Sequence, residues 1–337
     1  MYQKAFHDGT LSDKNFLVTG GAGFIGSNIV EYLMKYGAGK VVVLDNLSTG
    51  FEENIKPWLE KDNFNFIKGD ICSTQDCINA CEGMHFVFHQ AALGSVPRSI
   101  KDPVATNKVN VDGFLNVLVA ARDSAVKRIV YASSSSVYGD NPDLPKVESC
   151  IGSALSPYAV SKRTNELYAA VFSAVYGIEL IGLRYFNIFG PRQNPKGEYA
   201  AAIPLFMDAL LRNTSPLIFG DGQQSRDFTF VENAVQANIK SMFAPDKNAL
   251  TQVYNIAVGE KTSVNTLFSI LRNSSGASAE ASYRENRVGD IKDSLADITK
   301  ARHLLGYDPA IKIKEGLEIT LNWFRSYFNY QNLAKKN

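Results

Sequence analysis

The sequence predicts an α/β fold: a doubly wound parallel sheet followed by a smaller C-terminal α/β lobe. Stretches with helical periodicity alternate with short, continuously apolar runs, at 16–19, 40–45, 64–68, 86–89, 128–132 and 179–184. Strands that are apolar throughout are typical of a parallel sheet covered by helices on both faces. After Gly190 the sequence becomes polar and rich in Pro and Gly, and short strands and helices follow in mixed order. This change marks the second lobe.

The periodic stretches predict these helices: about 24–36, 104–123, 157–176 and, amphipathic, 314–328. The third has the clearest start, because Ser156 is a good N-cap and Pro157 suits the first helical position. We expect residues 1–185 to form mainly the sheet domain and residues 186–337 mainly the lobe, with the chain crossing between them.

The composition argues against several classes of function. The 337 residues carry 35 basic and 34 acidic side chains, a net charge of +1, so the basic excess of a general nucleic-acid binder is missing. No stretch approaches the about 18 apolar residues of a membrane span, and the N-terminus lacks the apolar segment of a secretory signal. We therefore expect a cytoplasmic protein that binds neither nucleic acid nor membrane.

The cysteines predict neither disulfides nor a metal site. Cys72, Cys77, Cys81 and Cys150 are too few for a disulfide scaffold in a chain of this length. Cys77 and Cys81 could share a helix face, with His85 nearby, but the spacing matches no zinc template. Reduced thiols are the expected state.

A glycine-rich turn follows the first strand and leads directly into a helix, with the sequence Gly20-Gly21-Ala22-Gly23-Phe24-Ile25-Gly26. In a Rossmann sheet such glycines allow a tight turn, close approach to a pyrophosphate and helix packing on the strand. Asp45 ends the second strand nineteen residues after Gly26, where a carboxylate would bind a ribose 2′-OH and repel a 2′-phosphate. The glycine turn and Asp45 together favour NAD over NADP as the cofactor. The alternative is that the glycine turn belongs to a fold that binds no cofactor.

Three further segments end strands at the same edge of the sheet: 69–71, 90–92 and 133–139. Asp70 could reach the adenine, although an ordinary turn residue explains it equally well. The small residues after Gln90 leave room for a cofactor to cross the sheet edge. The serines from Ser133 onward are either a loop or, at a strand's carboxyl end, a hydroxyl lining for a polar ligand.

Tyr158 and Lys162 lie four residues apart on one face of the helix at 157–176. A phenol with a pKa near 10 is a poor base at neutral pH, and a nearby ammonium lowers that pKa. Alone, such a pair is most often a surface contact. Beside the glycine turn, Asp45 and the serine strand end, it predicts an acid/base unit next to a nicotinamide.

With these motifs the chain resembles extended short-chain dehydrogenase/reductases that modify nucleotide-sugars, over about residues 14–326. The resemblance implies a Rossmann domain that binds NAD (1–185), a UDP-sugar lobe (186–337) and a catalytic group of Tyr158, Lys162 and Ser134. The implied cofactor contacts are Gly20, Gly23, Phe24, Ile25, Gly26, Asp45, Asn46, Ser48, Thr49, Gly50, Asp70, Ile71, Gln90, Ala91, Ala92, Tyr158, Lys162 and Tyr185.

Within that family the chain is most similar to 4-epimerases of UDP-N-acetylhexosamines, UDP-GlcNAc and UDP-GalNAc, with UDP-Glc and UDP-Gal as further candidate substrates. The resemblance places Arg226 and Arg287 at the diphosphate and Asp290 at the uridine ribose. The full implied substrate set is Gly94, Ser95, Ser134, Ser135, Ser136, Tyr158, Asn187, Gln193, Ala201, Arg226, Arg287, Asp290 and Ser294.

Three small features favour the N-acetyl subgroup. The loop at Gly94-Ser95 resembles its acetamido-side loop, and Gln193 and Asn194 supply amides. Ser294 stands where galactose-restricted relatives carry a tyrosine, so it would leave room for an acetamide. Without the resemblance, Ser294 reads as a plain surface serine.

The implied reaction is a C4 epimerisation through a transient 4-keto sugar, in which Tyr158 takes the 4-OH proton. A UDP-uronic acid 4-epimerase or decarboxylase is the first alternative. A 4,6-dehydratase is less favoured, because Ser135 and Ser136 stand where those enzymes carry Asp-Glu. A non-catalytic NAD-binding protein would have no use for the aligned Tyr158 and Lys162.

We also expect a homodimer, because relatives pair the two helices at 104–123 and 157–176 into a four-helix bundle. Both helices carry apolar residues beyond what one sheet face would bury, namely Phe114, Leu118, Leu167, Val171 and Phe172. The alternative is that these residues only cover the sheet.

Overall fold

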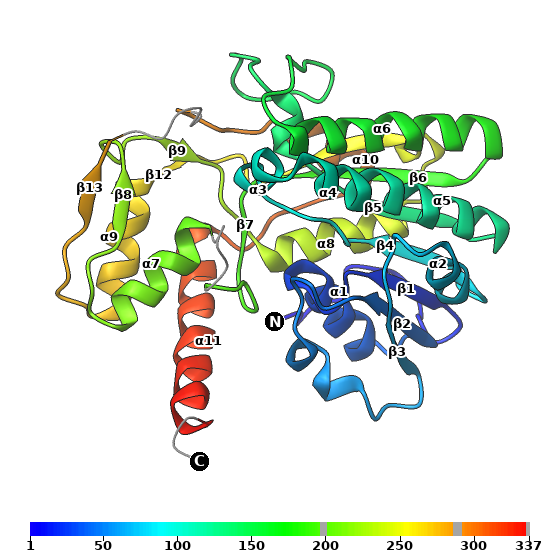
Figure 1. The fold of residues 1–337 in the computed structure, drawn as a ribbon, viewed down its shortest axis with the longest axis horizontal. Coiled ribbons are helices and arrows are strands. Elements are labelled where there is room, and N and C mark those ends of the chain that lie inside the picture. Colours follow the sequence, from blue (N-terminus) through cyan, green and yellow to red (C-terminus); the bar gives the residue numbers. More distant parts are fainter. Residues whose placement is uncertain (196–200, 286–291, 335–337) are drawn as a thin grey trace.

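The computed structural model describes residues 1–195, 201–285 and 292–334, which form a sheet domain and a smaller lobe beside it (Figure 1). The sheet has seven parallel strands in the order β11-β6-β5-β4-β1-β2-β3. Their bounds are β1 Asn15–Thr19, β2 Lys40–Asp45, β3 Phe64–Lys68, β4 Phe86–His89, β5 Arg128–Ser134, β6 Glu179–Tyr185 and β11 Gln252–Ile256. The order reverses between β1 and β4, which opens a crevice at the carboxyl ends of the strands.

The predicted doubly wound sheet is confirmed, and six of its strands match the apolar runs of the sequence. The seventh strand, β11, comes from the half of the chain assigned mainly to the lobe, and it pairs in parallel with β6. The C-terminal half therefore builds part of the sheet domain as well as the lobe.

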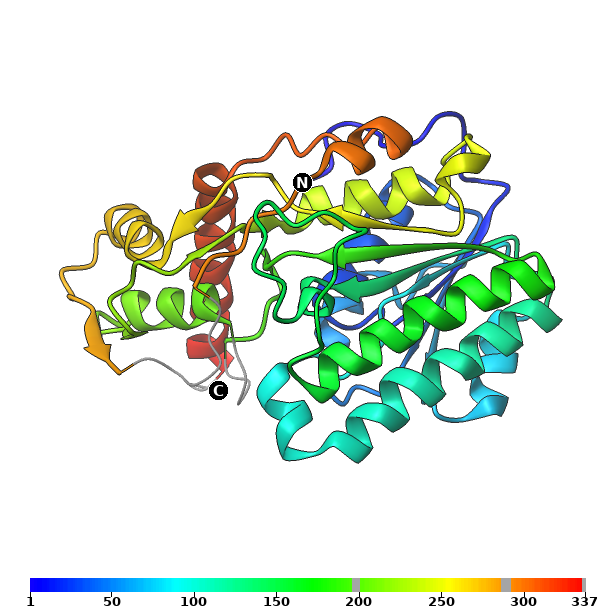
Figure 2. The same cartoon turned by 90° about the horizontal axis from the view of Figure 1, so that it is seen from above.

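Helices cover both faces of the sheet (Figure 2). One face carries α2 Thr74–Cys81, α5 Gly113–Asp123 and α6 Pro157–Tyr176. The other carries α1 Phe24–Lys35, α8 Val231–Met242 and α10 Thr299–Leu305. Helix α6 has the predicted bounds, because the Ser156 side chain accepts the N–H of Ala159 and Gly177 ends it at a positive φ of 70°.

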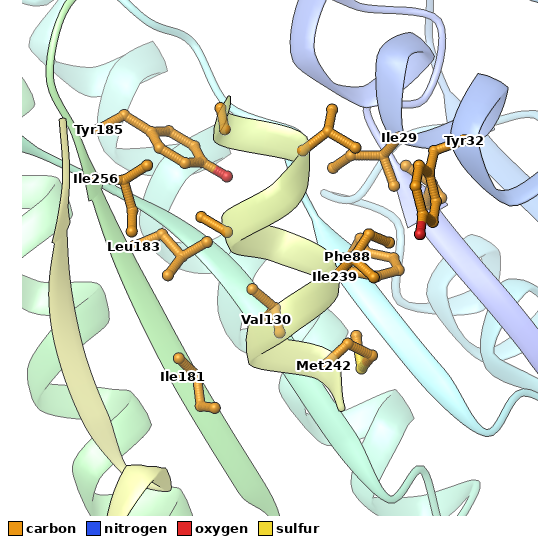
Figure 3. Close-up of a cluster of buried hydrophobic side chains, with 14 of the residues drawn as sticks. Ile29, Tyr32, Phe88, Val130, Ile181, Leu183, Tyr185, Ile239, Met242 and Ile256 are labelled. Atoms are coloured by element: carbon orange, nitrogen blue, oxygen red, sulfur yellow. The ribbon is translucent and has the colours of Figure 1, made fainter. Parts of the chain in front are cut away.

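Two apolar cores, one on each face, hold the sheet domain together. The core around α8 takes side chains from both halves of the chain. Figure 3 shows Ile29 and Tyr32 of α1 on one side of α8, and Leu183 and Tyr185 of β6 on the other. The second core lies under α2, α5 and α6.

The predicted helix at 104–123 is helical throughout but changes pitch. After α3 Val96–Lys101, it runs as α4 Pro103–Asn107, a π-helical turn Lys108–Asp112 and then α5. The turn buries Asn110, whose amide accepts the N–H of Leu93 and donates to the Ser161 hydroxyl. It thereby ties the loop after β4 to α6; π-turns often mark functional sites.

The lobe packs α7 Ala202–Leu211, α9 Val264–Ser275 and α11 Ile313–Ala334 around its own apolar core. The C-terminal half also forms three short strand pairs: β7 Ile188–Phe189 with β10 Thr229–Phe230, β8 Leu217–Phe219 with β13 Ser282–Arg284, and β9 Ser225–Arg226 with β12 Thr262–Ser263. Short 3₁₀ turns lie at Glu52–Asn54, Lys56–Trp58, Ser135–Tyr138 and Lys247–Ala249.

The prediction that Phe114, Leu118 and Phe172 are surplus to the sheet is wrong. All three are buried in the core under α5 and α6, because they lie on the faces that these helices turn toward the strands. A different set of apolar side chains is exposed on the surface of the chain. These residues lie along α6 and on the neighbouring α3 and α4: Ile100, Val104, Val160, Leu167, Val171 and Val175.

Within the described ranges, no helix is long and apolar enough to cross a membrane. In the same part of the chain, no three His, Cys, Asp or Glu side chains are grouped to hold a metal ion. The cysteines are free thiols, and Cys77 and Cys81 are buried against the core under α2. Burial raises the pKa of the Cys77 thiol to about 12, which makes it unreactive.

Candidate active site

A cavity runs along the carboxyl ends of the sheet strands. Its wall is made by the glycine turn after β1, Asp45 at the end of β2, Asp70 after β3, Gln90 after β4 and Ser134 at the end of β5. Residues far apart in the sequence meet here because parallel strands all end at one edge.

The glycine turn fits a pyrophosphate. Gly20 has a φ of +68°, and a Cβ there would lie 2.7 Å from the backbone nitrogen of Ala91. A Cβ on Gly26 would lie 2.1 Å from the carbonyl oxygen of Gly20. Helix α1 starts at Phe24, and its N-cap Gly23 has no side chain to accept from the first N–H groups, which suits them to bind an anion.

Asp45 is held at the turn by backbone donors. One carboxylate oxygen accepts the N–H of Leu47 at 2.8 Å, and the other accepts the N–H of Ala22 at 3.0 Å. Burial raises the pKa of Asp45, while these hydrogen bonds oppose the rise. Gly50 is outside the cavity wall; a Cβ there would lie 2.9 Å from the carbonyl carbon of Ala22, so it lets this loop close against the turn.

Tyr158, Lys162 and Ser134 all line the same cavity. The Lys162 ammonium donates to the carbonyl oxygen of Ala132 at 2.8 Å and lies 6.0 Å from the centroid of the Tyr158 ring. Ser134 lies near enough to the Tyr158 hydroxyl to oppose a rise in its pKa. The three side chains come from α6 and β5, as the motif predicts.

The protein alone does not lower the pKa of Tyr158, contrary to the expected effect of Lys162. Burial raises that pKa, because it removes water from the phenolate, and the nearby Ser134 hydroxyl only partly opposes the rise. Burial also lowers the pKa of Lys162 to about 8. Of the two groups, only Lys162 therefore has a pKa shifted toward neutral pH.

Tyr185 belongs to a closed ring of three hydrogen-bonded side chains. Its hydroxyl donates to Gln90 at 3.2 Å and accepts from Asn238 of α8 at 2.7 Å, and Gln90 donates to Asn238 at 3.1 Å. Figure 3 shows the Tyr185 hydroxyl turned toward α8. The ring holds Tyr185 and Gln90 in place on the cavity wall.

A second cavity opens toward the lobe and shares Asn187 and Ile188 with the first. Gln193, Ala201 and Arg226 line it, together with apolar side chains of α7 and β8. A guanidinium in a largely apolar cleft suits a ligand that is both anionic and planar, such as a nucleoside diphosphate.

The cavities collect most of the predicted site residues. Every predicted cofactor residue except Gly50 lines the first cavity. Among the predicted substrate residues, these line one cavity or both: Gly94, Ser134, Tyr158, Asn187, Gln193, Ala201 and Arg226.

The other predicted substrate residues lie apart from the cavity walls. Ser95 is the N-cap of α3, and Ser135 and Ser136 lie in the 3₁₀ turn after β5. The backbone N–H of Ser294 donates to the carbonyl of Ser225, beside Arg226, and Ser294 lines neither cavity. Arg287 and Asp290 lie outside the described residues.

Some wall residues carry no recognisable sequence signal, among them Leu93, Val109 and Ala132. Leu93 and Val109 are apolar, and Ala132 contributes its backbone carbonyl. Asp227 has no signal beyond its place directly after Arg226. It is fully buried, accepts the N–H groups of Val258 and Gly259 at 3.0 Å each, and holds the loop after β11.

The chain is similar to several known proteins. A model of the NAD dependent epimerase/dehydratase family matches residues 16–257. A putative UDP-glucose 4-epimerase of Methanocaldococcus jannaschii is 41% identical over 92% of this chain and 98% of its own.

Two solved structures extend the similarity. A UDP-N-acetylglucosamine 4-epimerase from Methanobrevibacter ruminantium M1, in complex with UDP-N-acetylmuramic acid, is 41% identical, with a TM-score of 0.88 over 94% of this chain and 99% of its own. A UDP-glucuronic acid 4-epimerase from Bacillus cereus, in complex with UDP-glucuronic acid and NAD, is 31% identical, with a TM-score of 0.86 over 93% of this chain and 99% of its own.

Proposed function

Because the chain belongs to the NAD-dependent epimerase/dehydratase family, we propose that it is a UDP-sugar 4-epimerase whose substrates are UDP-N-acetylhexosamines. Its cofactor is NAD. The observation that carries the proposal is that Tyr158, Ser134 and Lys162 line the first cavity, which shares Asn187 and Ile188 with the second. Residues 1–185 would mainly hold NAD and residues 186–337 mainly the UDP-sugar.

The chain's own residues supply positioning and proton transfer. Tyr158 accepts the proton of the sugar 4-OH, and Ser134, which lines the same cavity, binds O4. Lys162 holds the cofactor ribose, and Asn187 and Arg226 hold the sugar nucleotide. When bound, NAD supplies the hydride acceptor at C4, and its positive nicotinamide favours the phenolate. The same Tyr158 returns the proton after the 4-keto sugar has turned over.

A buried acceptor in the second cavity supports an N-acetylated substrate. The Gln193 amide donates to the carbonyl of Ile188 at 3.2 Å, while its buried oxygen has no partner among the described residues. An unpaired buried acceptor is costly unless a ligand donates to it. The N–H of an acetamido group would satisfy it, and the similarity to a UDP-GlcNAc 4-epimerase points the same way.

The size of the sugar substituent that the site accepts gives a direct test of the proposed N-acetylated substrate. Ser294→Tyr is expected to lower kcat/KM for UDP-GlcNAc and UDP-GalNAc more than for UDP-Glc and UDP-Gal. The added ring would crowd the wall beside Arg226, and crowding of this kind costs about 1–3 kcal/mol. Assays of all four substrates on wild type, Ser294→Tyr and Ser294→Ala decide it; an unchanged preference would show that Ser294 is not the gate.

UDP-uronic acid 4-epimerisation is the second candidate, because the Bacillus cereus structure is similar over nearly the whole chain. Incubation with a panel of UDP-GlcNAc, UDP-Glc, UDP-GlcA and UDP-GlcNAcA, with separation of the products, distinguishes the two. Fastest conversion of UDP-GlcNAc is expected. Preferential conversion of a 6-carboxylate substrate would replace the proposal with the alternative.

The exposed stripe of α6 is expected to pair two copies of the chain. Leu167 and Val171 are each 54% exposed, and an apolar stripe of this kind marks an interaction site. Wild type should have a dimeric mass in light scattering at micromolar concentration, and Leu167→Glu a monomeric mass. Ile78→Glu, at an exposed apolar residue of α2, should stay dimeric. A monomeric wild type would exclude this assembly.

A further inference from the structure

We propose that Glu166 is a positioning residue for the catalytic group, because its buried carboxylate ties helix α6 to strands β5 and β6. Helix α6 carries Tyr158 and Lys162, while the two strands carry Ser134 and Tyr185 at their ends. The inference rests on the proposed epimerase function and adds a residue that touches neither substrate nor cofactor.

The carboxylate of Glu166 is bound on every side. One oxygen accepts from the Ser133 hydroxyl at 2.6 Å and from Arg184 at 2.8 Å. The other accepts from Arg184 at 2.8 Å and from Arg163 at 2.9 Å. The side chains of Glu166 and Arg184 are 3% and 1% exposed, so the bidentate pair is fully removed from water.

The sheet register places this clamp directly behind the site. Ser133 pairs with Arg184 across β5 and β6, and the next pair along the two strands is Ser134 with Tyr185. Glu166 therefore holds the two strands at Ser133 and Arg184, one residue before Ser134 and Tyr185. A shift of β5 against β6 would move Ser134 and Tyr185 together.

The helix side of the clamp follows from spacing. Tyr158, Lys162 and Glu166 are four residues apart in turn, so they lie along one face of α6. When Glu166 is held by the strands, the rotation of α6 about its axis is restricted as well. The distance between the Tyr158 hydroxyl and Ser134 is then set from both sides.

Stability alone gives a weak reason for this arrangement. Burying an ion pair costs so much desolvation that an apolar pair of similar volume is often as stable or more so. Unlike an apolar pair, the ion pair fixes the orientation of its groups, because four hydrogen bonds define where the Glu166 carboxylate lies relative to Ser133, Arg184 and Arg163. A positioning role accounts for charged groups at this depth.

Glu166 also acts on Lys162 through its charge. Burial lowers the pKa of Lys162, and the negative charge of Glu166 opposes that effect. The other titratable groups that face Lys162 are Tyr158 on α6 and His89 on β4; burial lowers the pKa of His89 to about 3, so it is neutral. Arg184 lies beyond Glu166. Loss of the Glu166 charge should therefore favour deprotonation of Lys162.

Glu166→Gln, which keeps the size and removes the charge, is the primary test. We expect kcat to fall by on the order of tenfold to hundredfold, as a small misplacement of reacting groups does, with little change in KM. The limb of the pH profile of kcat that reports the titration of Lys162 should move to lower pH. The matched control is Glu179→Gln, which removes the carboxylate bound to Arg128 at 2.7 Å, at the opposite ends of the same two strands. The control should leave the pH profile unchanged.

A second variant covers the case in which Glu166→Gln does not fold. The double substitution Glu166→Leu with Arg184→Met replaces the ion pair by apolar side chains. It should fold and retain NAD, yet remain slow. Wild-type kcat in this variant would overturn the proposal, as would a Glu166→Gln pH profile equal to that of wild type.

The pKa of Lys162, measured by NMR in the NAD-bound protein without substrate, separates this inference from the proposed function. It should be lower in Glu166→Gln than in wild type and unchanged in Glu179→Gln. An equal pKa in Glu166→Gln and wild type would overturn the role of Glu166. A wild type that converts no UDP-sugar would instead overturn the proposed function.

Discussion

Tyr158→Phe is expected to lower kcat by about 10²- to 10⁴-fold, the contribution of a general acid/base group, while the protein still folds and retains NAD. Phenylalanine fills the same space but cannot exchange a proton with the sugar 4-OH. Ser134→Ala should cost less, because Tyr158 remains to exchange the proton. Steady-state rates, NAD content after denaturation and thermal unfolding report the three effects separately.

The control is Tyr168→Phe, on the same helix but at a partly exposed position away from the cavity. It should have wild-type rates. A fully active Tyr158→Phe would exclude this residue as the base, and with it the assignment of the 4-keto route to this site.

Gly26→Ala is expected to remove bound NAD, the second large effect. The new Cβ would lie 2.1 Å from the carbonyl oxygen of Gly20 and 2.9 Å from the Cα of Gly21, both part of the backbone that forms the turn. The turn or the start of α1 must then move. Overpacking of this kind costs about 1–3 kcal/mol, which corresponds to about tenfold to a hundredfold in NAD affinity.

Ser27→Ala serves as the control for that substitution, because it lies next along α1 and loses only a side-chain hydrogen bond to the carbonyl of Phe24. NAD released on denaturation should be near wild type in Ser27→Ala and strongly reduced in Gly26→Ala. Full NAD content in Gly26→Ala would mean that the cofactor does not depend on this turn.

Much of the fold can be predicted because its signals are local. The apolar runs of β1 to β6 identify buried strands, and Ser156, Pro157 and Gly177 mark both ends of α6. Strand β11 is different, since its place beside β6 depends on a crossover from the lobe half. Which way Phe114 and Phe172 face likewise depends on how the helices pack, and the sequence pattern alone does not determine it.

The candidate site also has parts that the sequence predicts and parts that depend on tertiary packing. The glycine turn, Asp45 and the Tyr158–Lys162 pair are short-range patterns, so the sequence alone identifies them. The contact between Glu166 and Arg184 joins a helix to a strand, and that between Asn238 and Tyr185 joins elements 53 residues apart. Such pairs depend on the tertiary packing, which no local pattern encodes. The raised pKa of Tyr158 also follows from burial, which spacing along a helix does not report.

The central claim is that hydride leaves and returns to C4 of the same sugar on NAD that the protein already holds. Purified protein should be incubated with UDP-GlcNAc carrying deuterium at C4, with no NAD added. The account predicts UDP-GalNAc that retains deuterium at C4, and NAD in the supernatant after denaturation. Loss of deuterium to solvent, or no conversion by folded protein that contains NAD, would contradict it.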